Sequence, residues 1–109
     1  MVPIPRSLLT STATVRVPTE EGGRQGFAAP AELVGVRYEQ RASVRATDYQ
    51  LQDGTAGLLF VDATNTRGAF EIPAGSLVSV DGGPESCAAS CARYADAHGR
   101  THHWEVELR

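Results

Sequence analysis

The sequence predicts an all-β fold, a small antiparallel β-barrel built by a single domain. Several short segments alternate apolar and polar residues with a period of two, which is typical of strands buried on one face. Glycine, proline and aspartate separate these segments at short intervals, and few stretches have the apolar period of a helix. Short strands joined by such turns predict a barrel or a sandwich. The 109 residues are close to the commonest length of one domain.

The single domain, residues 1–109, is expected to begin with an extended N-terminal arm over residues 1–11. Pro3 and Pro5 favour an extended backbone in this arm, because a proline restricts both its own φ angle and the residue before it. The barrel is expected to occupy residues 12–109.

The first half of the barrel contains two predicted strands, Thr12–Val17 and Glu32–Arg41. One side of the second strand carries Val34, Val36 and Tyr38. Between the two strands, Glu20–Gly26 is polar and rich in glycine, which indicates a loop. At about residues 42–56 we expect one long inter-strand loop, or a pair of strands that extends beyond the barrel. Loops of this length in small domains are often functional.

The second half of the barrel follows the same rules. Gly57–Asp62 is apolar up to its last residue and predicts a strand buried on both faces, and Asp62–Gly68 supplies turn residues after it. Ser76–Val80 predicts another strand, which Asp81–Gly83 ends in a tight hairpin. The clearest alternation lies in His102–Leu108. Its first face carries His102, Trp104, Val106 and Leu108, and its second face carries His103, Glu105 and Glu107.

The segment Pro84–His98 is ambiguous from local physics. It is rich in alanine, has a proline at its start and a glycine just after its end, and this pattern favours a helix. The hairpin residues directly before it favour a returning strand instead. The residues alone leave both alternatives open.

Composition and charge exclude several classes of protein. Thirteen acidic residues against ten arginines give a net charge of −3, which argues against a protein that grips nucleic acid along its phosphate backbone. No apolar run is long enough to span a membrane. The N-terminal residues have no basic segment followed by an apolar one, as a secretory signal would, so we expect folding in a cytoplasm.

No constellation in the sequence predicts catalysis, a metal or a cofactor. A zinc site would need two pairs of ligands at suitable spacing, and the adjacent histidines would face opposite sides of a strand. Glu105 and Glu107 share the polar face of one strand, which is more simply a wet surface than an acid–base pair. We expect reduced thiols, since a cytoplasm disfavours disulfides. The metal-like residues considered are Cys87, Cys91, His98, His102 and His103.

Three segments, in this order and at these distances, carry a resemblance to a known family. They are Pro3–Leu9, Leu59–Asn65 and His102–Leu108. Together they resemble the small minor capsid proteins of tailed bacteriophages and prophages, which are similar to head-completion or stopper proteins. The resemblance covers nearly the whole chain. It implies a small β-barrel, and it implies a strand near Glu85–Cys91, against the local helix propensity.

The resemblance also implies a function and partners. It suggests a virion protein of the head–tail connector, made in the bacterial cytoplasm, that assembles as a ring on the portal or adaptor protein. Such a ring closes the DNA-filled head and gives a tail-completion protein its docking surface. Double-stranded DNA passes the ring without sequence recognition, and no membrane takes part. The alternative function is a stand-alone SH3-like or OB-like barrel that binds peptide or nucleic acid.

Ring assembly requires arms, loops and strand edges that reach a neighbour, and three groups of residues are candidates. The arm, the long loop and an exposed edge of the last strand could each make such contacts. Their alternatives are a terminus folded back over its own barrel, a solvated loop and a wet face. The candidates are Pro3, Ile4, Pro5 and Arg6 in the arm, Arg41, Arg45, Asp48 and Tyr49 at the loop, and His103, Glu105 and Glu107 on the strand.

Overall fold

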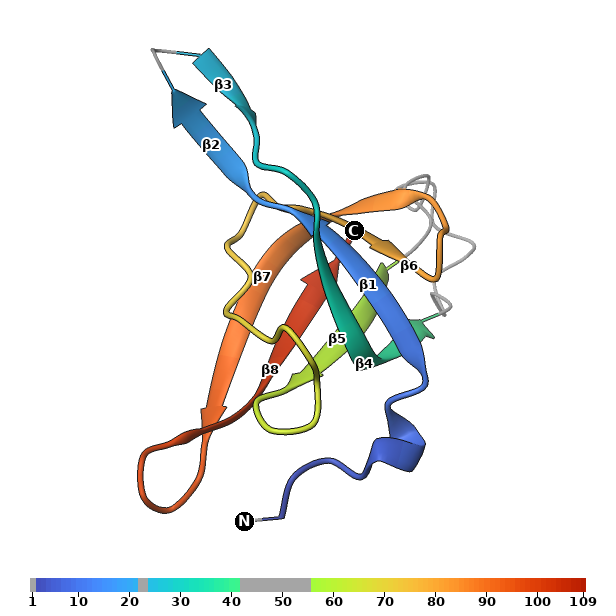
Figure 1. The fold of residues 1–109 in the computed structure, drawn as a ribbon, viewed down its shortest axis with the longest axis vertical. Coiled ribbons are helices and arrows are strands. Elements are labelled where there is room, and N and C mark those ends of the chain that lie inside the picture. The colour runs from blue at the N-terminus through green and yellow to red at the C-terminus, as the bar shows by residue number, and fades with distance from the viewer. Residues whose placement is uncertain (1, 22–23, 42–55) are drawn as a thin grey trace.

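The computed structural model describes residues 2–21, 24–41 and 56–109, and it confirms the all-β barrel (Figure 1). Six strands close the barrel in the order β1-β4-β5-β8-β7-β6, and every neighbouring pair is antiparallel. β2 and β3 form a separate two-stranded sheet. The elements are η1 (Arg6–Leu8, a 3₁₀ turn), β1 (Ser11–Arg16), β2 (Pro18–Glu21), β3 (Arg24–Phe27), β4 (Ala31–Arg41), β5 (Ala56–Asp62), β6 (Leu77–Val80), β7 (Glu85–Ala95) and β8 (Thr101–Leu108).

Alternate residues of the barrel strands point inward, and their side chains fill the interior of the barrel. Because successive side chains of a strand point to opposite faces, every second residue of β1, β5 and β8 reaches the core. Ile72, from the connection between β5 and β6, is also fully buried and adds to this core. The buried cluster is Ala13, Val15, Leu33, Val36, Leu59, Val61, Ile72, Val78, Ala88, Val106 and Leu108.

The segment that local physics left ambiguous forms the strand β7, as the resemblance implied. Asp81 and Gly82 both have positive φ angles, 52° and 76°, and turn the chain back after β6. β7 then pairs with β6 on one side and with β8 on the other. These two ladders satisfy its backbone groups and override the helix propensity of its alanines.

One predicted face is wrong, because a bulge interrupts β4. Gly35 has a φ of +87°, and the register with β1 shifts at this point: Ser11 pairs with Val36 and Thr12 with Val34. The extra residue reverses the alternation, as a bulge does. Leu33 and Val36 therefore point into the core, whereas Val34 leaves it and exchanges backbone hydrogen bonds of 3.0 and 2.8 Å with Arg67.

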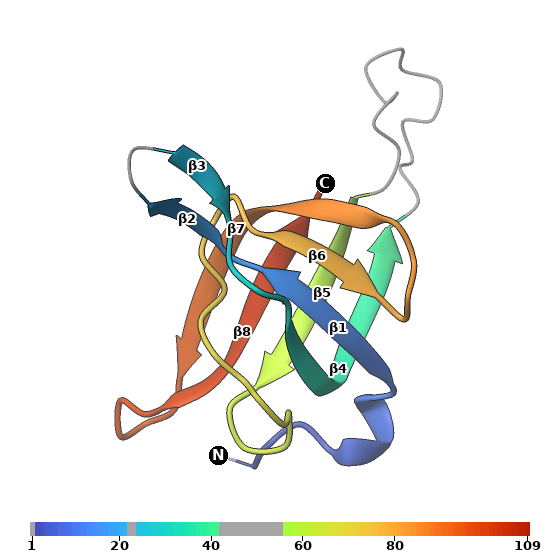
Figure 2. The ribbon, with the colours of Figure 1, turned by 45° about the horizontal axis from the view of Figure 1, so that its top comes forward.

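The loop predicted at Glu20–Gly26 is also wrong. This part of the chain contains most of β2 and β3, which pair from Pro18 opposite Phe27 to Glu21 opposite Arg24. The two strands continue β1 and β4 beyond the barrel and project from one of its ends as a ribbon (Figures 1 and 2). We call this two-stranded element the ribbon. A ribbon buries no apolar face against the core, so its residues can be polar and still pair through the backbone.

Candidate interaction surfaces

The N-terminal arm folds back over its own barrel, which is the alternative that the sequence left open. The Ile4 N–H donates to Asp62 Oδ1 at 2.9 Å, and Asn65 Nδ2 donates to the Ile4 carbonyl at 2.8 Å. Leu9, just after η1, is buried. Of the four predicted contact residues, Pro3 and Ile4 are half-buried against the barrel, whereas Pro5 and Arg6 are exposed. The exposed part of the arm remains accessible to a partner.

Asp62 is the buried residue that connects the arm to the barrel. Its carboxylate is fully buried and accepts hydrogen bonds from the N–H groups of Ile4, Thr64 and Asn65. The hydroxyl of Thr66 accepts from the Asp62 N–H and donates to the carbonyl of Gly35. The turn after β5 therefore ties together the arm, the end of β5 and the bulge of β4. The sequence indicated a turn here, but nothing in it assigned Asp62 this role.

The predicted contact residues of β8 lie on the outer wall of the barrel and not on a free edge. β8 is paired with β5 on one side and with β7 on the other, so its backbone has no free ladder. The side chains of His103 and Glu105 are half-buried, and His103 Nε2 lies 3.0 Å from Glu105 Oε2. Glu107 is half-buried beside them and faces Arg109 at 3.5 Å. These residues form a packed polar wall.

Two histidines link this wall to the arm. His102 Nε2 lies 2.6 Å from the Val2 carbonyl, which only accepts, so His102 donates from Nε2. Its Nδ1 then accepts from His103 Nδ1, 2.8 Å away, when His102 is neutral. The ring of His103 also stacks on Tyr94 with centroids 4.8 Å apart. When Nδ1 of His103 donates to His102, the contact between His103 Nε2 and Glu105 Oε2 is a hydrogen bond only if one of these two atoms also carries a proton.

The outer face of β5 departs from its prediction. Gly57, Leu59 and Val61 face the core, but Leu58 and Phe60 are half-buried on the outer wall. The strand is therefore not buried on both faces. Phe60 lies opposite Glu105 of β8 and opposite Arg37 of β4, so polar side chains flank it.

The predicted contacts in the long loop mostly lie outside the described residues. Arg45, Asp48 and Tyr49 belong to residues 42–55, which the structure does not describe. Arg41 is the last residue of β4, and its backbone pairs with Ala56 at the start of β5.

The ribbon presents strand edges that the barrel lacks. Within the described part of the chain, β2 and β3 pair only with each other, whereas each barrel strand has two neighbours. Phe27, at the base of the ribbon, is 42% exposed, and the Arg16 guanidinium lies 5.0 Å from its ring centroid. Arg16 also forms a bidentate ion pair with Glu85, at 2.7 and 2.8 Å. The ribbon is thus anchored at its base, and no other described strand pairs with either of its edges.

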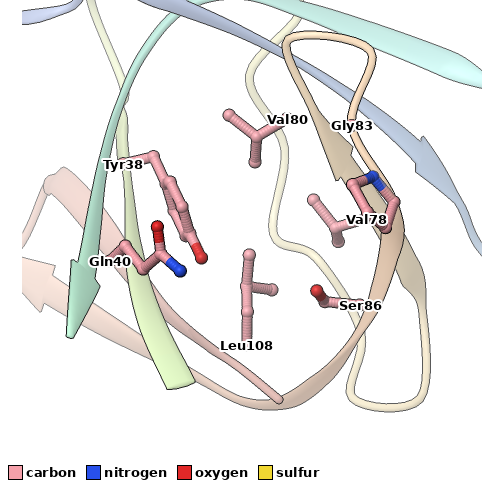
Figure 3. A pocket seen from close by; sticks show the side chains of 8 residues that line it. Tyr38, Gln40, Val78, Val80, Gly83, Ser86 and Leu108 are labelled. Carbon is pink, nitrogen blue, oxygen red and sulfur yellow. The ribbon is translucent and has the colours of Figure 1, made fainter. Parts of the chain in front are cut away.

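A small pocket of about 160 Å³ lies between β4, β6, β7 and the end of β8 (Figure 3). Tyr38 and Gln40 of β4 form one wall, Val78 and Ser86 of β6 and β7 form the other, and Leu108 lies between them. The Tyr38 ring also covers Gly57, where an added Cβ would lie 2.5 Å from the ring. The pocket contains no charged side chain, so it does not resemble an acid–base site.

The thiols and histidines considered for metal binding lie on separate elements. Cys87 and Cys91 are both free thiols on β7, and burial raises the pKa of the Cys91 thiol. Among the described residues, no group of three or more His, Cys, Asp or Glu side chains is placed to hold a metal ion. No described helix is long and apolar enough to cross a membrane.

The chain was compared with known protein families, curated proteins and solved structures. These comparisons found no significant match.

Proposed function

We propose that this protein is a structural component of a phage or prophage head–tail connector. Copies assemble as a ring on the portal or adaptor protein, help to close the DNA-filled head and offer a docking surface to a tail-completion protein. The proposal combines the resemblance of three segments with one structural observation, the placement of the exposed contact elements.

That observation is that the two ends of the barrel each carry an element suited to a partner. The ribbon projects from one end, and the N-terminal arm lies at the opposite end (Figures 1 and 2). Exposed large hydrophobic side chains occur on both elements: Phe27 on the ribbon, and Val2 and Leu8 on the arm, which are 80% and 45% exposed. A protein that joins two others needs two such surfaces, and a rigid closed barrel holds them at a fixed separation.

The alternative of a peptide-binding or nucleic-acid-binding barrel has less support in the described residues. Single-strand binding commonly uses aromatic side chains gathered on one groove, together with basic residues. Phe27 and Tyr94 are the exposed aromatic side chains of the described chain, and they lie on different elements, the ribbon and β7. The net charge of −3 also disfavours a phosphate-binding face.

The test is reconstitution with the portal, adaptor and tail-completion proteins of the same phage or prophage. We expect cryo-electron microscopy to show a ring of this protein on the portal axis, between head and tail components. Deleting the gene should yield separate heads and tails, and expression of the wild-type protein in trans should restore joined particles. A protein that binds neither portal nor adaptor, and whose deletion leaves joined particles intact, is not a connector. Binding to nucleic acid or peptides without the portal would support the alternative.

A further inference from the structure

The ribbon is the described element with the most unused hydrogen-bonding capacity. A two-stranded ribbon alone is marginally stable in water, and free strand edges are templates for pairing with another chain. The closed barrel offers no such edge among the residues described, so the ribbon edges are the places where copies can extend a sheet.

The register shows which backbone groups these edges present. Pro18 has no N–H, and the neighbouring Ala28 N–H donates to the Val17 carbonyl at 2.8 Å. Since bonded and non-bonded pairs alternate in an antiparallel ladder, Pro18 opposite Phe27 and Glu20 opposite Gln25 are non-bonded pairs. Their backbone groups therefore point outward: those of Pro18 and Glu20 from β2, and those of Gln25 and Phe27 from β3.

The charges of the two strands select how copies can meet. The sequence of β2 contains Glu20 and Glu21 and no basic residue, whereas that of β3 contains Arg24 and no acidic residue. Two β2 strands side by side would each carry two negative charges in their sequence, and two β3 strands would each carry one positive charge. A β3 strand beside the β2 strand of another copy joins two strands of opposite net charge, which favours this pairing.

We infer that, in the ring of the proposed function, on which this inference rests, β3 of each copy pairs antiparallel with β2 of the next copy. β2 and β3 of one ribbon are antiparallel, so when neighbouring ribbons project in the same direction, β3 of one copy is antiparallel to β2 of the next. Gln25 of one copy and Glu20 of the next exchange backbone hydrogen bonds, and the Phe27 N–H donates to the next Pro18 carbonyl. The contact joins two different edges, so it is heterologous, the type of contact that forms a ring where the rotation between copies closes.

This pairing gives the ring a continuous sheet to which every copy contributes two strands. Each ribbon occupies about 10 Å of the circle, because neighbouring strands lie about 4.8 Å apart. The six-stranded barrels are wider than their ribbons, so the ribbons lie closer to the ring axis than the barrels. A single junction is too short for a stable dimer, and copies pair once the portal or a high concentration holds them side by side.

Crosslinking of mixed rings tests the inference. Glu20→Cys and Gln25→Cys proteins are made in a Cys87→Ser, Cys91→Ser background, assembled on the portal separately or together, and oxidised. We expect disulfide-linked dimers between residues 20 and 25 in the mixture and none in either protein alone. Facing residues at hydrogen-bonded positions have Cα atoms about 5.5 Å apart, which a disulfide can span. Crosslinks in rings of one variant alone would show like edges meeting and would overturn the inference.

Charge reversal gives an independent readout. Arg24→Glu should reduce ring assembly on the portal at least several-fold, and mixing this variant with a Glu20→Arg, Glu21→Arg variant should restore assembly. Arg100→Glu, in the turn between β7 and β8, is the matched control and should assemble as the wild type does. Equal assembly of the Arg24 and Arg100 variants would contradict the pairing.

The two proposals fail in different ways. A ring that forms on the portal without the crosslink between residues 20 and 25 overturns the ribbon pairing and leaves the connector function in place. If no ring forms on the portal, the connector function fails, and the same mixture is then oxidised as concentrated protein alone. A crosslink between residues 20 and 25 there supports edge pairing between copies, and its absence overturns it.

Discussion

The amide of Ile4 and the carboxylate of Asp62 form a 2.9 Å hydrogen bond across 58 positions of the chain, and this contact fixes the arm to the barrel. The same carboxylate accepts from the amides of Thr64 and Asn65, so the turn after β5 and the arm depend on one buried group.

Replacing Asp62 with Asn should release the arm and weaken the fold. An amide group in this position presents an N–H donor to at least one backbone donor and removes the negative charge. We expect the free energy of unfolding in urea to fall by about 2 kcal/mol, the scale of hydrogen bonds to a charged group. Trypsin should also cleave faster after Arg6. Glu32→Gln, at an exposed position of β4, is the control, and an equal effect of both variants would contradict this role of Asp62.

Replacing Gly35 with Ala tests the bulge of β4. A φ of +87° is unfavourable for a residue with a Cβ, and we expect a loss of about 1–2 kcal/mol in the free energy of unfolding. Gly26→Ala is the matched control, because its φ lies outside the left-handed range and no atom lies within 4 Å of the added Cβ. Thermal or urea unfolding of both variants measures the difference. Equal stabilities would show that the backbone at Gly35 adapts without strain.

The Arg16–Glu85 ion pair should affect how the free energy of unfolding decreases as the pH falls. Its side-chain hydrogen bond lowers the pKa of Glu85 below the ordinary value of 4.5. This contribution is fully present above pH 4.5 and is lost as the pH falls through the lowered pKa, because protonation breaks the pair. Glu85→Gln should therefore lose less stability than the wild type on acidification. Urea unfolding at a series of pH values measures the free energy of unfolding of both proteins. The same loss of stability at acid pH in the wild type and in Glu85→Gln would contradict this role of the ion pair.

The two cysteines should react at different rates. Burial raises the pKa of the Cys91 thiol, and a thiol reacts as its thiolate, whereas Cys87 is exposed on the same strand. At about pH 8, iodoacetamide should modify Cys87 several-fold faster than Cys91. Mass spectrometry of Cys87→Ser and Cys91→Ser proteins assigns the slow and fast reactions. A faster reaction at Cys91 would show that its side chain is more open than the structure indicates.

Sequence periodicity identified the strands whose alternation is complete. β1 and β8 lie where the alternation predicted them, because one face of each packs into a shared core and selects apolar residues at alternate positions. β5 lies where its apolar run predicted a strand, although its outer face is only half-buried. The same rule placed Val34 on the wrong face, since one glycine with a positive φ shifts the alternation and a pattern of residue types does not record φ.

Other features could not be predicted from neighbouring residues. The ribbon was missed because its pairing uses backbone groups and needs no apolar side chains. The link between Asp62 and the arm joins residues far apart in the chain, so no local pattern indicates it. β7 depends in the same way on its two neighbouring strands, which is why local propensity left it undecided. The connector function and the predicted loop contacts remain predictions.

The continuity of β1 with β2 and of β4 with β3 has a mechanical consequence. The ribbon extends two strands that are directly bonded to each other in the barrel wall, and the arm begins at the other end of β1. Tension between the ribbon and the arm therefore runs along β1, at right angles to its hydrogen bonds with β4 and β6. Bonds loaded in this shearing direction resist together and do not open one after another, so the molecule can carry force between its two ends.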